Sequence, residues 1–290
     1  MQHAASEPPA PTAIDGLSLA HRHMVRLRLV SARMVLLQRT EKIASHHAST
    51  GEEAALVGAA LVRGVPLADY VHHAFGSRAA RAKGHAPPDF VASRACRVAP
   101  ASGVVGAHLT QAVGAAWAAK IKKDDVVTLA LFGIEAIAGG DFHNAMNFAG
   151  VFKAPCVLVC RHDGTTDVAG KAVAYGVANA KVDGMDVAAV QKLVRAAVER
   201  AASGQGPTLI EAITRPVTSL DDAALAGDAV LGDLPRDEAL VREVRAELDG
   251  AIAAAESAGA PDPASIFEDV YAAPPASLAA QKREISQWRR

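Results

Sequence analysis

Residues 125–164, DVVTLALFGIEAIAGGDFHNAMNFAGVFKAPCVLVCRHDG, decide the fold class of this chain. They contain two short apolar runs, at residues 125–132 and 155–160, on either side of a segment at residues 136–151 that favours a helix. Continuous apolar runs of this length are typical of strands that are buried on both faces of a sheet. The order strand, helix, strand predicts parallel strands joined by a crossover helix, and therefore an α/β fold.

The same alternation extends outward from this stretch. Downstream, the sequence predicts a short strand at residues 181–184, a helix from Asp186 to Ala202 and a strand at residues 207–214. We therefore expect a parallel sheet covered by helices on both faces, with a helical arm at the C-terminus. Further helices are predicted at residues 19–45, from Thr50 to about residue 64, at 67–75, 107–120, 236–257 and within 264–287, with an ordered loop at 77–102.

The composition excludes several classes of protein. Hydrophobic residues make up 50% and charged residues 21%, which is an ordinary globular mix and excludes disorder of the whole chain. The net charge of −1 provides no electrostatic footprint for nucleic acid or an anionic membrane, so we expect neither as a partner. The cysteines Cys96, Cys156 and Cys160 are too few for a disulfide framework or a zinc site, and predict buried thiols and a cytoplasmic location.

The N-terminal segment, MQHAASEPPAPTAIDG, is expected to be a mobile tail. It lacks the basic and apolar regions of a signal peptide. No apolar run in the chain reaches the roughly 18 residues that a membrane-spanning helix needs. The sequence therefore predicts neither a targeting segment nor a membrane span.

Polar residues follow both strands of the central stretch. The first strand runs into GIEA at residues 133–136, and the second ends in RHDG at residues 161–164. Because ligands of parallel α/β sheets bind beyond the carboxyl ends of the strands, we expect chemistry at these positions. A nucleotide-binding loop is disfavoured, since GIEAIAGG lacks the glycine spacing of a Rossmann or Walker motif.

Several segments resemble, in order, the E1 alpha subunits of the thiamine-diphosphate-dependent 2-oxo acid dehydrogenases, most closely the branched-chain type. HASTGEEAALVGAAL (residues 47–61) is similar to the family's His-x-Ser-x-Gly-Gln-Glu-Ala helix start. GAHLTQAVGAAWAAK is similar to its Gln-(Ile/Val)-Pro-Gln-Ala-Val-Gly-Ala-Ala helix, and residues 139–160 are nearly identical to its central helix and strand. VDGMDVAAV, PTLIEAIT and IFEDVYAAPPASLAAQ follow in family order, so the resemblance spans about residues 19–281.

This resemblance implies a thiamine-diphosphate-binding fold and an alpha2-beta2 assembly with an E1 beta partner. The family decarboxylates a 2-oxo acid and passes the acyl group to a lipoyl arm. The expected organisation is a flexible tail at residues 1–16, a thiamine-diphosphate-binding-fold domain at 17–235 and a C-terminal helical arm at 236–290. Because the family's interface segments are retained, we expect a homodimer or a heterotetramer.

The resemblance also indicates positions for thiamine diphosphate and Mg²⁺. The cofactor-binding positions are Gly133, Glu135, Ala136, Val105, Arg161 and His162, and the metal-binding positions are Asp163 and Thr165. Asp163 stands where the family has a metal-binding Asn, and Thr165 where it often has a Tyr whose carbonyl binds the metal. No catalytic residue is carried over.

The chain departs from the family's pattern where the charge of the cofactor would be neutralised. Ile134 stands at the position of a metal-binding acid, although Mg²⁺ prefers oxygen ligands at about 2.1 Å. The stretch with a diphosphate-gripping Tyr-Arg pair is missing after Val62, and the loop after Thr214 has no His pair. Residues 103–105, GVV, replace a Ser-Pro-Leu that lies against the cofactor. Burying about three negative charges without partners costs several kcal/mol per charge, so we expect weak or no cofactor binding.

Each of these positions has a second interpretation. Ile134 and Glu135 mark either a degenerate metal site or a site to which Glu135 is re-aimed. Asp163 is either a metal ligand or a turn carboxylate, and His162 either a strand-end polar residue or an anion ligand. Packing or capping roles are expected for His46, His47, His143 and Asn147, and residues 78–83 are expected to form either a solvated loop or a subunit contact.

The function therefore has two interpretations, and the sequence leaves open whether this chain is itself an enzyme. In the first, it is a catalytically degenerate E1 alpha-like subunit that keeps the fold and the assembly surfaces. In the second, it is an active E1 alpha subunit that binds thiamine diphosphate and Mg²⁺ with an E1 beta partner. The residues favour the first interpretation, because the departures fall on the cofactor positions.

Overall fold

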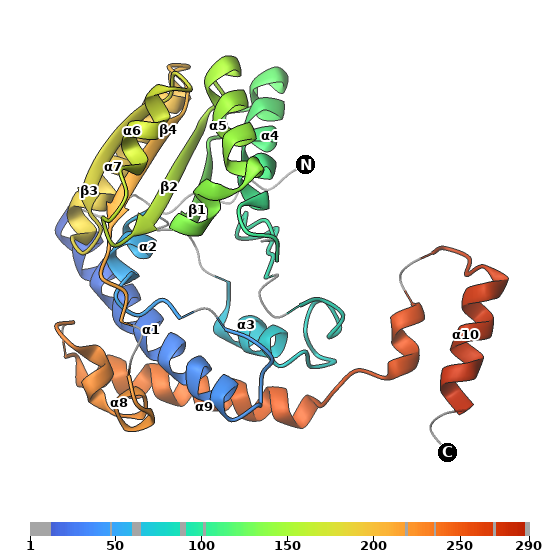
Figure 1. The fold of residues 1–290 in the computed structure, drawn as a ribbon. Coiled ribbons are helices and arrows are strands. Elements are labelled where there is room, and N and C mark those ends of the chain that lie inside the picture. The colour runs from blue at the N-terminus through green and yellow to red at the C-terminus, as the bar shows by residue number, and fades with distance from the viewer. Residues whose placement is uncertain are drawn as a thin grey trace, which may run out of the picture. The chain divides into compact units, whose positions relative to one another are not determined.

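A computed structural model (Figure 1) describes residues 13–46, 48–59, 65–87, 91–100, 103–217, 220–234, 236–268 and 271–287. A parallel sheet of β1 (Thr128–Gly133), β2 (Cys156–His162), β3 (Ala178–Asp183) and β4 (Thr208–Ile213) has the order β1-β2-β4-β3. In its register Gly133 pairs with Arg161, and His162 with Ile213. All carboxyl ends therefore lie along one edge. The expected parallel α/β fold is confirmed.

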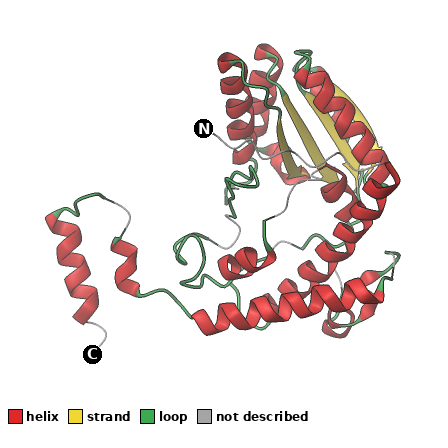
Figure 2. Ribbon diagram, turned by 180° about the vertical axis from the view of Figure 1, so that it is seen from behind, coloured by secondary structure: helices red, strands yellow, loops and turns green. Residues whose placement is uncertain are grey.

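Helices cover both faces of this sheet, as Figure 2 shows. Along β2, Cys156, Leu158 and Cys160 pack against α4 (Ala107–Lys122), α5 (Gly140–Phe152) and α6 (Val168–Val173). Val157 and Val159 point to the other face, where they pack with α7 (Val187–Ala202) and α2 (Glu53–Ala59). Because side chains alternate along a strand and both faces are covered, the strands are continuous apolar runs.

Local chemistry accounts for several element boundaries. The Asp186 carboxylate caps α7, as predicted, by accepting hydrogen bonds from the backbone N–H groups of Ala188 and Ala189 at 2.9 and 3.0 Å. The helix expected to begin at residue 136 is interrupted. A 3-10 turn, η1 (Ile134–Ala138), precedes α5, which begins at Gly140. The short helix α6 was not predicted, since its six residues give too brief a pattern.

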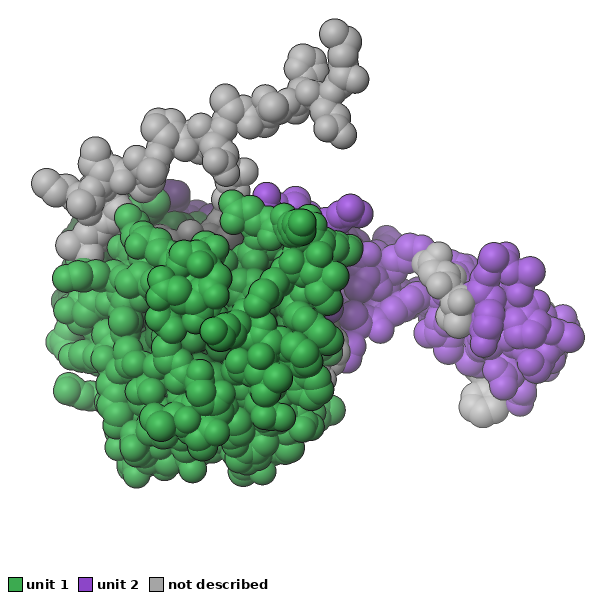
Figure 3. Space-filling view, turned by 90° about the horizontal axis from the view of Figure 1, so that it is seen from above, with its two compact units in different colours: residues 1–33, 48–62, 102–241 green, residues 34–47, 63–101, 242–290 purple. Residues whose placement is uncertain are grey.

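The chain divides into two compact units, which Figure 3 colours green and purple. Unit 1 comprises residues 1–33, 48–62 and 102–241, and unit 2 comprises residues 34–47, 63–101 and 242–290. The expected domain boundaries at residues 16 and 235 stay a prediction. Residues 1–12 of the expected tail lie outside the described residues, and α1 (Ala13–Arg39) begins at Ala13.

Unit 1 also contains the first part of α1, together with α8 (Asp222–Ala226) and η2 (Asp228–Leu231). Ala20 and Met24 of α1 form a small core cluster with α2 and with Val187. Unit 2 contains the end of α1, α3 (Leu67–Ala74), most of α9 (Glu238–Ala258), η3 (Pro263–Phe267) and α10 (Ala276–Gln287). Within the described residues, no helix has both the length and the apolar composition to cross a membrane.

Candidate functional site

The loop before α4 lies against the turn that follows β1. A Cβ atom on Gly106 would lie 3.4 Å from the Ala136 Cβ atom, and the Val105 carbonyl oxygen lies 4.0 Å from the position of a Cβ on Gly139. Ala136 is buried, whereas the Val105 side chain is 62% exposed. The fold therefore brings together two positions, Val105 and Ala136, that the sequence assigned to one site.

Ile134 and Glu135 leave the end of β1 in different directions. The Ile134 side chain packs against the hydrophobic core that α4 and α5 form over the sheet. The Glu135 carboxylate lies over Gly133, where an added Cβ would be only 2.5 Å from Oε2. The carboxylate therefore occupies space next to the Gly133 backbone that a side chain at position 133 would share. Glu135 is thus one residue beyond the position at which the resemblance implies a metal ligand.

Arg161, near the end of β2, forms an ion pair with Glu52, which precedes α2. Their side chains are only 20% and 16% exposed. Burial raises the pKa of Glu52, Arg161 opposes this, and the Glu53 and Glu135 carboxylates raise the pKa of Glu52 further. Arg161 is therefore engaged by an internal carboxylate, and Glu135 lies within electrostatic reach of that pair.

The loop after β4 contacts the segment that contains Glu52. The Val217 backbone N–H donates to the Thr50 carbonyl oxygen at 2.8 Å. Gly51 has φ +88°, and a Cβ there would lie 2.1 Å from the Arg215 carbonyl oxygen. Glycine is required here for both the positive φ and the close approach. These contacts hold Glu52 at the carboxyl edge of the sheet.

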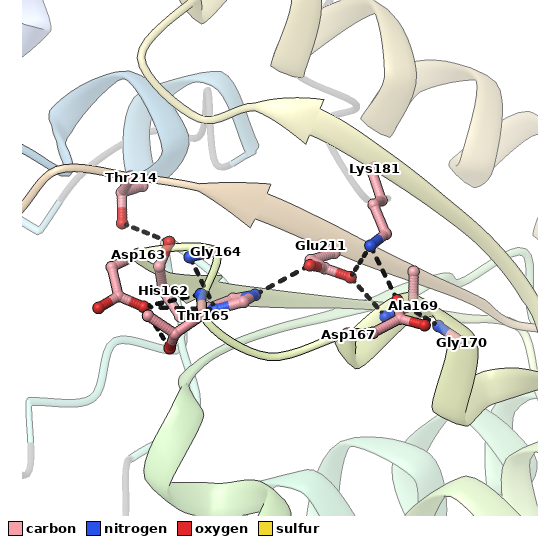
Figure 4. A network of polar contacts seen from close by, with 10 residues as sticks. All are labelled: His162, Asp163, Gly164, Thr165, Asp167, Ala169, Gly170, Lys181, Glu211 and Thr214. Atoms are coloured by element: carbon pink, nitrogen blue, oxygen red, sulfur yellow. Dashed lines mark hydrogen bonds and ion pairs between the residues drawn. The ribbon is translucent and has the colours of Figure 1, made fainter.

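His162 belongs to a buried polar network, which is shown in Figure 4. Its Nε2 atom lies 3.1 Å from Oε1 of Glu211, and the Gly164 backbone N–H donates to its Nδ1 atom at 3.1 Å. Because Nδ1 accepts, the imidazole proton is assigned to Nε2, from which it is donated to Glu211. Both side chains are essentially inaccessible to solvent. His162 is thus turned into the protein interior.

Glu211 extends this network to the next strand. Its Oε2 atom accepts a hydrogen bond from the Ala169 backbone N–H at 2.6 Å and lies 3.5 Å from Nζ of Lys181. Nζ of Lys181 also lies 2.8 Å from Oδ1 of Asp167. The hydrogen bond from Lys181 lowers the pKa of Asp167, and the same contact raises the pKa of Lys181. The network joins β2, β4, β3 and the start of α6.

Asp163 closes the turn after β2. Its Oδ1 atom accepts hydrogen bonds from the Thr165 side chain at 2.7 Å and from the Thr165 backbone N–H at 3.1 Å. The hydrogen bonds from Thr165 lower the pKa of Asp163, and the Asp163 side chain is 60% exposed. One carboxylate oxygen is thus used by the turn, which is the structural interpretation of this residue.

The side chains at the carboxyl edge of the sheet do not fit a magnesium ion that carries a diphosphate. Mg²⁺ needs several oxygen ligands in near-octahedral geometry, but the side chain at position 134 is an apolar isoleucine that packs against the core. The guanidinium that could neutralise phosphate charge, Arg161, is already paired with Glu52. Within the described residues, no three His, Cys, Asp or Glu side chains are arranged to hold a metal. The positive charge of Arg161 is thus already neutralised by a carboxylate of the chain itself.

Of the other residues named from the sequence, His46, His143 and Arg78 make contacts within the protein. Nδ1 of His46 lies 3.0 Å from the Tyr70 hydroxyl, and Nδ1 of His143 lies 2.5 Å from the Tyr175 hydroxyl. In the loop at residues 78–83, the Arg78 backbone N–H donates to the carbonyl oxygen of Gly259 at 2.9 Å. His47 lies outside the described residues, and Asn147 is exposed on α5.

Sequence reasoning missed Glu52, Glu211 and Lys181. The pattern around Glu52 indicates only an acid in a helix start. Glu211 carried a signal that could have been used, because a carboxylate inside an apolar strand (PTLIEAIT) must have buried partners. Lys181 carried none, since a lysine at a strand edge is ordinarily solvated.

Comparison with known proteins assigns the family. The family model described as dehydrogenase E1 component matches residues 57–217, more than half of the chain. This chain belongs to the dehydrogenase E1 component family. The resemblance of the sequence to the branched-chain alpha subunits is thereby confirmed, since similar proteins carry that name.

Two of these similar proteins are bacterial alpha subunits. This chain is 36% identical over 242 residues to the 3-methyl-2-oxobutanoate dehydrogenase subunit alpha of Mycobacterium tuberculosis. The alignment covers 72% of this chain and 64% of that protein. The chain is 31% identical to the 2-oxoisovalerate dehydrogenase subunit alpha of Pseudomonas aeruginosa, covering 91% of this chain and 80% of that protein. It thus spans less than two thirds of the first of these relatives. A transketolase mutant from Pichia stipitis matches with a TM-score of 0.49 and 14% identity, covering 95% of this chain and 47% of that one.

Proposed function

We propose that this chain is an alpha-type subunit of a branched-chain 2-oxo acid dehydrogenase that contributes fold and assembly surfaces, and that its own sheet edge does not hold magnesium and thiamine diphosphate. The observation that carries this proposal is the position of Ile134. Its partly buried side chain packs against the core cluster, at the position where the resemblance implies a metal-binding acid. The Arg161–Glu52 ion pair supports it, because the edge needs no external anion for charge balance.

The outer face of α4 and α5 supports assembly with an E1-beta-like chain. A groove of about 390 Å³ lies between these helices, and none of its lining residues is charged. Trp117 stacks on Phe152 there, with 4.2 Å between ring centroids, and Phe148 is 48% exposed. Ile121 and Val151 add exposed apolar surface at the ends of α4 and α5. Exposed aromatic and aliphatic side chains beside an uncharged groove are typical of a protein interface.

The second candidate function is an active E1 alpha subunit. Two observations favour it: the Glu135 carboxylate lies at the end of β1, and Asp163 is exposed at the end of the neighbouring strand. A partner chain would then have to complete the metal coordination and neutralise the diphosphate. This candidate requires Glu52 to release Arg161, or the phosphates to be neutralised elsewhere.

Assembly is tested by co-expressing this chain with an E1 beta chain of a branched-chain dehydrogenase and measuring the mass by light scattering. We expect a complex that Val151→Asp disrupts. Val173→Asp is the matched control, because Val151 and Val173 are 67% and 69% exposed, but Val151 belongs to α5, one of the two helices that line the groove, and Val173 belongs to α6. A lone monomer at micromolar concentration with the E1 beta chain present contradicts the proposal.

Cofactor binding is tested on the same complex by calorimetry with thiamine diphosphate and Mg²⁺. We expect no binding tighter than about 100 μM. Tight magnesium-dependent binding would establish the second candidate function instead. The double substitution Ile134→Asp and Glu135→Gly is not expected to recover binding, because it leaves the Arg161–Glu52 pair in place.

A further inference from the structure

In the ion pair between Glu52 and Arg161, a carboxylate of the chain itself binds a guanidinium that could otherwise bind an anionic ligand. A guanidinium presents five N–H donors in a planar fork that suits carboxylates and phosphates. In Arg161 the Nη1 atom donates to the Glu52 carboxylate. The Nε atom is buried and has no hydrogen-bond partner among the described residues. Arg161 thus has one donor satisfied by the chain itself and one left without an acceptor.

The charges around Arg161 favour its ion pair with Glu52 over the binding of an external anion. Glu53, the neighbour of Glu52, is neutralised by Arg28 of α1, with 2.6 Å between Nη2 and Oε2. Glu135, at the end of β1, remains within electrostatic reach of Glu52. An external anion bound at Arg161 would therefore be close to the Glu52 carboxylate and would also be repelled by the Glu135 carboxylate. Like charges at such distances oppose binding.

We propose that Glu52 is a built-in counter-ion that occupies Arg161 and excludes phosphate-bearing ligands from this edge of the sheet. Without the charge of Glu52, Arg161 is free to take an oxyanion on its guanidinium fork. This inference rests on the proposed function and deepens it, since it names Glu52 as the residue that prevents a diphosphate from binding at the same edge of the sheet. It also gives a role to the position at which the helix-start motif has Gln and this chain has Glu52.

The test uses the full chain and inorganic pyrophosphate, titrated by calorimetry without metal at low ionic strength. Glu52→Gln keeps the shape of the side chain and removes its charge. Glu256→Gln is the control, because it removes the same charge from an exposed ion pair with Lys42 elsewhere in the chain. Glu52→Ala provides a second variant, and thermal melting establishes that each variant is folded.

We expect pyrophosphate to bind the Glu52→Gln and Glu52→Ala variants about tenfold or more tightly than the unaltered chain. Glu256→Gln should behave as the unaltered chain does. Adding Arg161→Gln to Glu52→Gln should abolish the gain. The inference is overturned if folded Glu52 variants show no gain, if the unaltered chain already binds equally well, or if the gain survives the loss of Arg161.

The outcome is separate from that of the proposed function. Pyrophosphate binding is measured on this chain alone, so a failure to assemble with an E1 beta chain leaves the result intact. Conversely, Glu52 variants that gain nothing would leave the assembly result standing.

Discussion

Glu211 in the middle of β4 and His162 at the end of β2 form one buried polar pair, with 3.1 Å between Oε1 and Nε2. The second carboxylate oxygen of Glu211 accepts the Ala169 backbone N–H at 2.6 Å, which fixes the start of α6. A buried carboxylate is tolerated only when its oxygens have partners, and here Oε1 has His162, while Oε2 has both the Ala169 N–H and Lys181. The pair therefore holds β2, β4 and α6 in one arrangement.

Glu211→Ala should lower the free energy of unfolding by about 3 kcal/mol or more, because it leaves the Ala169 N–H and the His162 imidazole buried without their acceptor. Urea unfolding followed by circular dichroism measures this. Glu256→Ala, in an exposed ion pair, should cost less than about 1 kcal/mol. Equal losses for the two variants would show that the Glu211 network contributes nothing beyond a surface pair.

The pH dependence of stability should contain a component from Glu52. Burial raises the pKa of Glu52 above its ordinary value of 4.5. Because the folded chain binds this proton more tightly than the unfolded chain, the free energy of unfolding falls as pH rises from 4.5 through the raised folded pKa. Glu52→Gln lacks this component, so its stability relative to the unaltered chain should increase across that window.

Urea unfolding of both proteins from about pH 4 to about pH 8 measures this difference. The comparison isolates Glu52, since all other titrating groups are common to the two proteins. A difference in unfolding free energy that does not change with pH would contradict the raised pKa.

Gly51→Ala should lower the free energy of unfolding by about 2–4 kcal/mol. Gly51 has φ +88°, and the new Cβ would lie 2.1 Å from the Arg215 carbonyl oxygen, so the backbone of the loop after β4 must move. Gly176→Ala is the matched control. Its φ is also positive, at +65°, but nothing lies within 4 Å of the added Cβ. It should therefore cost only the conformational strain, about 1 kcal/mol. Similar losses for both would exclude the steric contact.

Thiol reagents should distinguish the three cysteines. Burial raises the pKa of Cys156 and of Cys160 to about 12, so neither thiolate is populated near neutral pH. Cys96 is partly exposed, so the prediction of a buried thiol was wrong at this position. Titration of the native chain with a disulfide reagent should modify Cys96 alone, and Cys96→Ser should remove this reaction until urea is added. Rapid native labelling of the Cys96→Ser variant would contradict the buried positions on β2.

Much of the secondary structure could be predicted from local pattern. The runs that became β1, β2 and β4 are apolar because both faces of the sheet are covered, and Asp186 marks the start of α7 by its own chemistry. Boundaries were less predictable. The glycines at positions 139 and 140 divide the expected helix into η1 and α5, which depends on how the chain turns over the sheet edge.

The candidate site, like the fold, could be predicted from the sequence only in part. The sequence by itself determined which elements form and which family the chain resembles, because these depend on spacing and composition within short segments. It also identified Ile134 as an apolar residue at a metal position. Only the tertiary structure decided that Ile134 packs against the core, that Glu52 contacts Arg161, and that His162 turns to Glu211. These pairs join residues 109 and 49 positions apart, and long-range partners are chosen by packing of the whole chain.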